Sequence, residues 1–243
     1  MKKEAASAGV LDTPFGKFAR LQILTIEDLF TGKKTGGTVM GMMMPPYHGA
    51  ALRAEENGTY EQFARVAEAA GIPIMVQDAP LSGVTLSVPL LARLAREVPL
   101  VRYFKIEMPG TAAKLRALVE AGGKAIAGPF DGEEGITLMA DLDAGATGTM
   151  PSALLPDLIA PVLAHHRQGR RAEAAAAYAH ILPLVNFENR QCGLRAAKAV
   201  MAEGGVIESE AVRHPLQPLD PAARAGLLEL ARQADPLALR WGK

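Results

Sequence analysis

Short apolar runs alternate with longer helical segments along most of the chain, and this alternation constrains the fold more than any other feature. The runs are TVMGMMMP (38–45), IPIMVQ (72–77), LVRYFKI (100–106), KAIAGP (124–129) and ATGTMP (146–151). Their starts are 34, 28, 24 and 22 residues apart, which is close to the roughly 30 residues of a strand-helix-strand unit. The spacing predicts an α/β fold with a parallel sheet, either a barrel or a doubly wound sheet.

Segments with helical spacing separate these runs and then continue without them after residue 151. Helices are predicted at 59–71, 87–98, 110–123 and 133–145, and then at about 154–168, 170–185, 190–204 and 221–234. Ser87 is the expected N-cap of the second helix. We therefore divide the chain into an N-terminal segment without this pattern (1–37), a partial barrel (38–151), and a last barrel helix with C-terminal helices (152–243).

Composition excludes several classes of protein. The chain has 243 residues, of which 49% are hydrophobic, and 26 basic residues balance 26 acidic ones. Such a balance gives no field that would gather nucleic acid or anionic lipid, so we expect neither partner. The longest uncharged run, 35–52, is interrupted by glycine and proline and would make a poor membrane helix. The single cysteine, Cys192, cannot form an internal disulfide, which fits the cytoplasm.

The run VRYFKIE places two charged residues in a strand that otherwise looks bound for a core. Residues two apart on a strand share a face, so Lys105 and Glu107 should lie side by side. One interpretation is an ion pair in a polar layer of the barrel. The other is a catalytic pair, with an amine made nucleophilic by its surroundings and a carboxylate that transfers protons.

Acidic residues gather in GPFDGEEG (128–135) without indicating a metal site. Their spacing matches no calcium loop, and carboxylates placed before a helix favour its positive N-terminus. We therefore expect no metal and no organic cofactor. Gly128 would allow a substrate to approach the backbone closely.

Five segments in order resemble the superfamily of dihydrodipicolinate synthase and N-acetylneuraminate lyase. They are VMGMMMPPYHG (39–49), IPIMVQDAPLSGV (72–84), VRYFKIE (101–107), IAGPFDGEEG (126–135) and GATGTMPS (145–152). The resemblance implies a (β/α)8 TIM barrel, of which about five βα units are visible here, with a C-terminal helical extension. It also implies that Lys105 forms a Schiff base with a small 2-oxo acid.

Two positions resemble the 2-keto-3-deoxyarabonate dehydratase branch of that family. Gln77 stands where most members have a tyrosine, and Lys105 is followed by Glu107. An amide cannot carry protons, so the proton transfers would pass to Glu107 while Gln77 orients a hydroxyl. The implied enzyme is a hydro-lyase acting on a 2-keto-3-deoxy sugar acid. The other enzymatic reading is a pyruvate-dependent aldolase or 4-hydroxy-tetrahydrodipicolinate synthase.

The remaining expected site residues line the substrate pocket. They are Tyr47, His48, Gly128 and Thr149. Against this reading, 37 residues precede the first run where three further βα units of the family would need about a hundred. A catalytically inactive, truncated family member is therefore a third reading. Open sheet edges favour a homo-oligomer or a partner that covers them.

Overall fold

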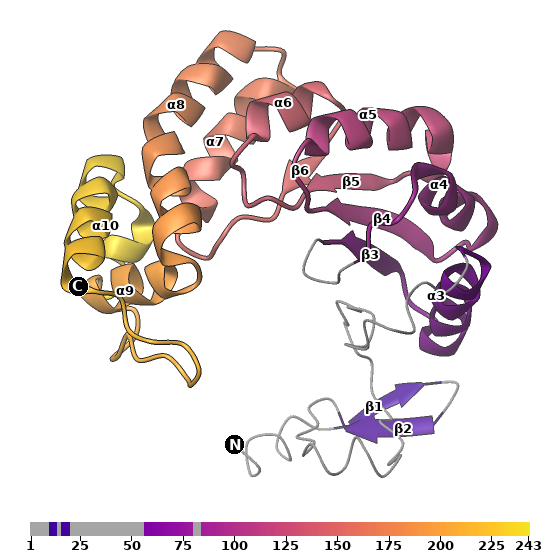
Figure 1. Cartoon of the computed structure of the whole chain (residues 1–243), viewed down its shortest axis with the longest axis horizontal. Coiled ribbons are helices and arrows are strands. Elements are labelled where there is room, and N and C mark those ends of the chain that lie inside the picture. The colour runs from indigo at the N-terminus through magenta and orange to yellow at the C-terminus, as the bar shows by residue number, and fades with distance from the viewer. Residues whose placement is uncertain (1–9, 14–15, 20–55, 80–83) are drawn as a thin grey trace.

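The computed structural model describes residues 10–13, 16–19, 56–79 and 84–243 of the chain (Figure 1). Its main sheet is parallel, in the order β3 (Ile74–Asp78), β4 (Val101–Ile106), β5 (Gly128–Asp131) and β6 (Gly148–Thr149). A separate hairpin pairs β1 (Val10–Thr13) with β2 (Gly16–Ala19). The predicted parallel sheet is confirmed.

Strand β5 begins later than the sequence predicts. The run 38–45 and the proposed boundary at residue 37 lie outside the described residues. Residues 123–125 form a 3-10 turn instead of a strand, so β5 starts only at Gly128. The positive φ of Gly123 (52°) explains this difference, because it ends the preceding helix and turns the chain before the strand can begin.

Eight α-helices are present in the described part of the chain. Those between or before the strands are α3 (Glu56–Ala70), α4 (Val88–Glu97), α5 (Thr111–Gly122) and α6 (Leu138–Asp143). Those after the sheet are α7 (Pro156–Arg167), α8 (Arg171–Phe187), α9 (Arg195–Glu203) and α10 (Pro221–Ala234). The predicted cap is confirmed, since the Ser87 hydroxyl accepts a hydrogen bond from the backbone N–H of Leu90 at 3.2 Å.

Two helices begin later than the sequence predicts. Helix α6 was expected from residue 133, but Glu134 (φ 57°) and Gly135 (φ 86°) adopt left-handed conformations that a helix cannot contain. Helix α9 was expected from residue 190, but Glu188–Cys192 form a π-helical turn that continues α8. Both differences place irregular backbone near the carboxyl ends of the strands, where barrel active sites assemble.

The two faces of strand β4 differ. One packs against the helices, and the other carries charged residues. Phe104 and Ile106 are fully buried and belong to the hydrophobic core, together with Leu91 of α4 and Leu115 of α5. Burying side chains of this size stabilises the fold by about 1.5–3 kcal/mol each. Because side chains alternate along a strand, Lys105 lies on the opposite face.

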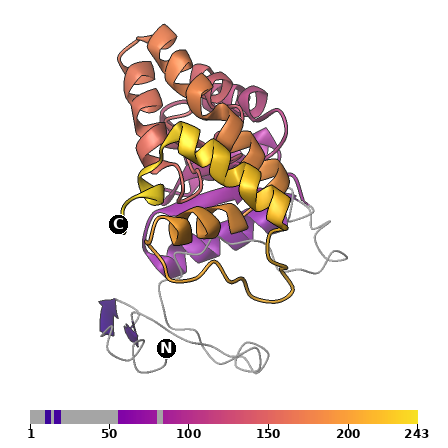
Figure 2. The ribbon, with the colours of Figure 1, turned by 90° about the vertical axis from the view of Figure 1, so that its left-hand side faces the viewer.

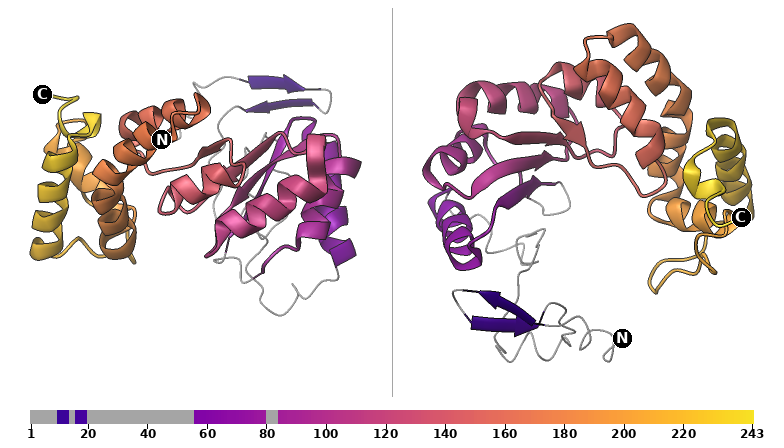
Figure 3. Two further views of the ribbon diagram at one scale, coloured as in Figure 1. Left: turned by 90° about the horizontal axis from the view of Figure 1, so that it is seen from above. Right: turned by 180° about the vertical axis from the view of Figure 1, so that it is seen from behind.

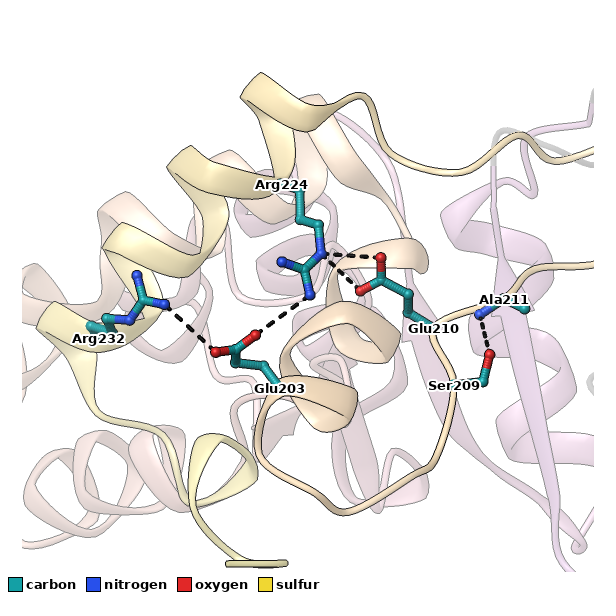
Figure 4. A network of polar contacts seen from close by, with 6 residues as sticks. All are labelled: Glu203, Ser209, Glu210, Ala211, Arg224 and Arg232. Atoms are coloured by element: carbon teal, nitrogen blue, oxygen red, sulfur yellow. Dashed lines mark hydrogen bonds and ion pairs between the residues drawn. The ribbon is translucent and has the colours of Figure 1, made fainter.

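The C-terminal helices form a group at one end of the sheet. Helices α7 and α8 pack against each other, and α10 packs on α8 and α9 (Figures 2 and 3). The irregular segment 205–220 joins α9 to α10 and is fastened by Arg224, whose guanidinium binds Glu210 at 2.9 Å and Glu203 at 3.5 Å (Figure 4). No helix in the described ranges is long and apolar enough to cross a membrane.

Candidate active site

Lys105 and Glu107 meet at the carboxyl end of β4. The distance between Lys105 Nζ and Glu107 Oε2 is 2.8 Å, and the two side chains are 13% and 26% exposed. The predicted adjacency of these residues is therefore correct. A largely buried amine beside a carboxylate suits both interpretations of the pair, because a structural ion pair and a catalytic pair need the same contact.

Gln77 reaches the same carboxylate from the neighbouring strand. It lies opposite Lys105 in the parallel register of β3 and β4, and its Nε2 donates to Glu107 Oε2 at 2.5 Å. Its buried Oε1 has no hydrogen-bond partner in the described part of the chain. Gln77 thus holds Glu107 with its donor and keeps an acceptor free for another group.

Gly132 allows the loop after β5 to approach this pair closely. A Cβ atom at Gly132 would lie 2.9 Å from both Lys105 Cγ and Glu107 Cβ, a distance that forces a neighbour to move. The backbone N–H of Gly132 donates to the carbonyl of Ile106 at 2.8 Å. Only glycine fits here without displacing the charged side chains.

Asp131 shapes that loop through both of its carboxylate oxygens. It accepts from the backbone N–H of Glu133 at 2.8 Å, from that of Gly135 at 2.9 Å and from the Thr149 hydroxyl at 2.6 Å. Burial raises the pKa of Asp131, and these three bonds oppose the rise by favouring the charged form. From α8, the Tyr178 hydroxyl donates to the carbonyl oxygens of Gly135, at 2.8 Å, and Ile136.

The loop presents a second carboxylate to Lys105. Burial raises the pKa of Glu134, the positive charge of Lys105 opposes this rise, and the negative charge of Glu107 adds to it. The side chain of Asn189, in the π-helical turn, also interacts with Glu134 and donates to the Val185 carbonyl at 2.9 Å. Lys105 therefore lies in the field of more than one acidic group.

Glu188, the first residue of the π-helical turn, is a buried acid beside this loop. Its side chain is 1% exposed, and burial raises its pKa to about 7, with Ser152 opposing the rise and Glu134 adding to it. Neither carboxylate oxygen has a partner with hydrogen-bond geometry among the described residues. A carboxyl group in such surroundings keeps its proton well above the pH at which an exposed one loses it.

Of the four other predicted site residues, the structure describes Gly128 and Thr149. Tyr47 and His48 lie outside the described residues. Thr149 is at the site, with its hydroxyl bound to Asp131. Gly128 starts β5, and the space where its Cβ would be is filled by the rings of Tyr103 and Phe130, each with an atom 2.6 Å away. The close approach at Gly128 is thus made by these aromatic rings.

Comparison with known proteins identifies the family. A model of the dihydrodipicolinate synthetase family matches residues 30–234. The chain belongs to this family. Membership agrees with the predicted TIM-barrel fold, of which the described residues form four consecutive parallel strands and the following helices.

Known proteins similar to this chain include a dehydratase and several synthases. The chain is 58% identical over 205 residues to L-2-keto-3-deoxyarabonate dehydratase from Azospirillum brasilense. The aligned region covers 84% of this chain and 66% of that protein. It is 28% identical to a 4-hydroxy-tetrahydrodipicolinate synthase from Corynebacterium diphtheriae, over 68% of this chain and 53% of that one.

Solved structures support the same fold. The dihydrodipicolinate synthase from Rhodopseudomonas palustris superposes with a TM-score of 0.66 at 23% identity, over 74% of this chain and 62% of that chain. The 4-hydroxy-tetrahydrodipicolinate synthase from Methylacidiphilum fumariolicum SolV gives a TM-score of 0.68 at 22% identity, over 74% and 60%. The chain thus spans between about half and two thirds of the length of these relatives.

Several residues at the site were not identified from the sequence. Gly132, Glu134 and Asp131 stand in the GPFDGEEG motif, where the acidic residues looked like partners for a helix N-terminus. The close spacing of glycines and carboxylates after a strand could have indicated a functional loop. For Glu188 there was no such signal, because its burial depends on packing between α8 and the loop.

Proposed function

We propose that the chain is a Schiff-base-forming hydro-lyase that removes water from a 2-keto-3-deoxy sugar acid of the 2-keto-3-deoxyarabonate type. The observation that supports this best is the shared Glu107 oxygen, 2.8 Å from Lys105 Nζ and 2.5 Å from Gln77 Nε2. The 58% identity to L-2-keto-3-deoxyarabonate dehydratase supports the same substrate class. Because the chain spans 66% of that relative, its activity is part of the proposal.

In the first step Glu107 takes a proton from the Lys105 ammonium, and the freed amine attacks C2 of the 2-oxo acid. The C2 oxygen receives this proton and a second one from the attacking nitrogen and leaves as water, which forms a protonated imine. The imine withdraws electrons from C3, so that the C3 proton becomes acidic. Glu107, in contact with the amine, accepts this proton, and the electron pair of the C3–H bond moves into the enamine.

In the second step the enamine expels the hydroxyl group from C4. Glu107 now carries the proton taken from C3 and gives it to the departing oxygen, so that water leaves and a C3–C4 double bond forms. Gln77 orients the C4 hydroxyl, and its Nε2 lies 2.5 Å from the Glu107 carboxylate that must protonate that hydroxyl. Water then hydrolyses the imine and restores the free amine.

Trapping with borohydride tests the imine directly. The purified protein is incubated with pyruvate and borohydride, and its intact mass is measured. We expect one reduced adduct in the native protein and none in Lys105→Ala. A folded protein that acquires no adduct would favour the inactive, truncated reading.

Proton exchange separates the dehydratase from the other enzymatic reading. In deuterated water, Glu107→Gln should abolish exchange at C3 of pyruvate while borohydride still traps the adduct. Unchanged exchange in this variant would show that another group takes the proton. The second candidate, a 4-hydroxy-tetrahydrodipicolinate synthase, is favoured by the other curated relatives, but Gln77 stands where the resemblance calls for a tyrosine.

We also infer a homo-oligomer located in the cytoplasm. Among the described strands of the parallel sheet, β3 and β6 each pair on one side only. Strand edges without a partner favour association. Light scattering after size exclusion tests this, and a monomer at micromolar concentration would overturn it. Cys192 is free and buried, which is compatible with a reducing compartment.

A further inference from the structure

Asp78 and Lys114 form an ion pair that the proposed chemistry does not use. Asp78 is the last residue of β3, and Lys114 lies in the first turn of α5. The distance between Lys114 Nζ and Asp78 Oδ2 is 2.5 Å, and the two side chains are 10% and 2% exposed. Taking both charges out of water is costly, so a pair of this kind needs further bonds to be favourable.

Those further bonds go to the backbone of Leu86, just before α4. The N–H of Leu86 donates to Asp78 Oδ1 at 2.9 Å, and Lys114 Nζ donates to the Leu86 carbonyl at 2.5 Å. The pair therefore connects three pieces of the fold, namely the end of β3, the entry to α4 and the start of α5. It provides a partner for the N–H and for the carbonyl of Leu86 at the same time.

The same strand end carries Gln77. Asp78 is its direct neighbour, and the Asp78 carbonyl accepts a hydrogen bond from the backbone N–H of Glu107 at 2.8 Å. The Gln77 amide then reaches the Glu107 carboxylate at 2.5 Å. A shift of this strand end would move the Gln77 amide relative to Glu107, whereas Lys105 and Glu107 would stay together on β4.

A hydrophobic pair could have closed this junction without the cost of two buried charges. The charged pair adds directional hydrogen bonds, and each of them fixes the distance between two specified atoms. Catalytic groups lose much of their effect when they are displaced by about 1 Å.

We propose that the Asp78–Lys114 pair is a positioning device that holds the end of β3 so that the Gln77 amide stays on Glu107. The proposal rests on the proposed function, in which Gln77 and Glu107 act together. Asp78 and Lys114 are positioning residues and do not touch the reacting atoms.

A double-mutant cycle tests this coupling through C3 proton exchange on pyruvate. Lys114→Met should lower the exchange rate about tenfold or more, as expected for a displaced catalytic group. Gln77→Ala should lower it as well, and the combined variant should be no slower than Gln77→Ala alone. If the two losses multiply, the pair acts independently of Gln77 and the proposal is overturned. Lys124→Met, at an exposed lysine in the 3-10 turn that follows α5, is the matched control.

A second variant guards against simple unfolding. Lys114→Met leaves a buried carboxylate alone, whereas Asp78→Asn/Lys114→Met removes the ammonium without leaving a charge. The doubly substituted protein should fold, as judged by circular dichroism, and should show the same loss of exchange. Native exchange in this folded variant would contradict the proposal.

The side-chain amide signal of Gln77 in a 1H–15N spectrum gives a readout that does not need the reaction. The signal is assigned by its absence in Gln77→Ala. We expect it to move in Lys114→Met and to stay in place in Lys124→Met, and an unmoved signal would overturn the proposal. Borohydride trapping separates the two failures, because a native protein without an adduct contradicts the proposed function alone.

Discussion

Tyr178 of α8 and Gly135 of the loop after β5 are 43 residues apart in sequence and are joined by a 2.8 Å hydrogen bond from the phenol to the carbonyl. The same hydroxyl also donates to the Ile136 carbonyl. This contact connects the helical C-terminal part of the chain to the loop that carries Glu134. The C-terminal helices therefore contribute to the shape of the site.

Removing that phenol should loosen the loop. Tyr178→Phe keeps the ring but removes the hydroxyl bonded to the Gly135 and Ile136 carbonyls, leaving Gly135 only the longer 3.3 Å bond from the Leu138 N–H, so we expect the free energy of unfolding to fall by about 1–3 kcal/mol. Urea denaturation measures this change. Tyr60→Phe, at a partly exposed ring that Arg93 covers, is the control and should cost less. Equal losses in both variants would contradict the role of Tyr178.

A side chain at Gly132 should disturb the lysine and the glutamate together. Gly132→Ala would place its Cβ 2.9 Å from Lys105 Cγ and Glu107 Cβ, so we expect a loss of borohydride-trapped adduct and of C3 exchange. Overpacking of this kind typically costs about 1–3 kcal/mol of stability. In Gly148→Ala the nearest atom would be 3.4 Å away, an ordinary contact, and adduct formation should stay near native. A Gly132→Ala protein with native exchange would show that the site tolerates the shift.

Glu188 should make the protein less stable as the pH rises. Burial raises its pKa to about 7, so the folded state keeps a proton that the unfolded state releases near its ordinary pKa of 4.5. The free energy of unfolding then falls between about pH 4.5 and 7 and is unaffected below that range. The shift corresponds to a loss on the order of 3 kcal/mol at neutral pH.

Replacing Glu188 with glutamine removes this dependence. Relative to the native protein, Glu188→Gln should gain stability from pH 5 to pH 8, and urea denaturation at both values measures the gain. Glu229→Gln, at an exposed position on α10, should show no such trend. A constant difference between native protein and Glu188→Gln across this range would contradict the buried, protonated acid.

The segment between α9 and α10 should depend on Arg224. Its guanidinium binds Glu210 through one nitrogen to both carboxylate oxygens and reaches Glu203 as well (Figure 4). Because these groups are about one third exposed, Arg224→Met should cost no more than about 1 kcal/mol of global stability. Local opening should nevertheless increase, so we expect faster cleavage of residues 205–220 by thermolysin.

Arg232→Met provides the comparison for this effect. Arg232 is more exposed and contacts only Glu203 in the described network, at 3.6 Å. Its removal should leave the cleavage rate nearly unchanged. If both variants are cleaved equally fast, the contacts of Arg224 do not fasten the segment.

The sequence by itself determined the order of the helices and strands, and it determined that Lys105 and Glu107 lie next to each other. Alternating apolar and helical segments predicted the parallel sheet, and the bounds of α10 agree with the prediction at 221–234. Adjacency of Lys105 and Glu107 followed from the two-residue period of a strand. Such features depend on neighbours close in the chain, so local pattern is enough to predict them.

Tertiary structure decided which distant groups complete the site. Gln77 reaches Glu107 across 30 residues, and Lys114 reaches Asp78 across 36. Gly132 and Glu188 owe their roles to the packing of a loop against β4 and α8. No local pattern encodes these contacts, because they arise only when several elements bury their apolar faces together and thereby fix which polar groups face one another.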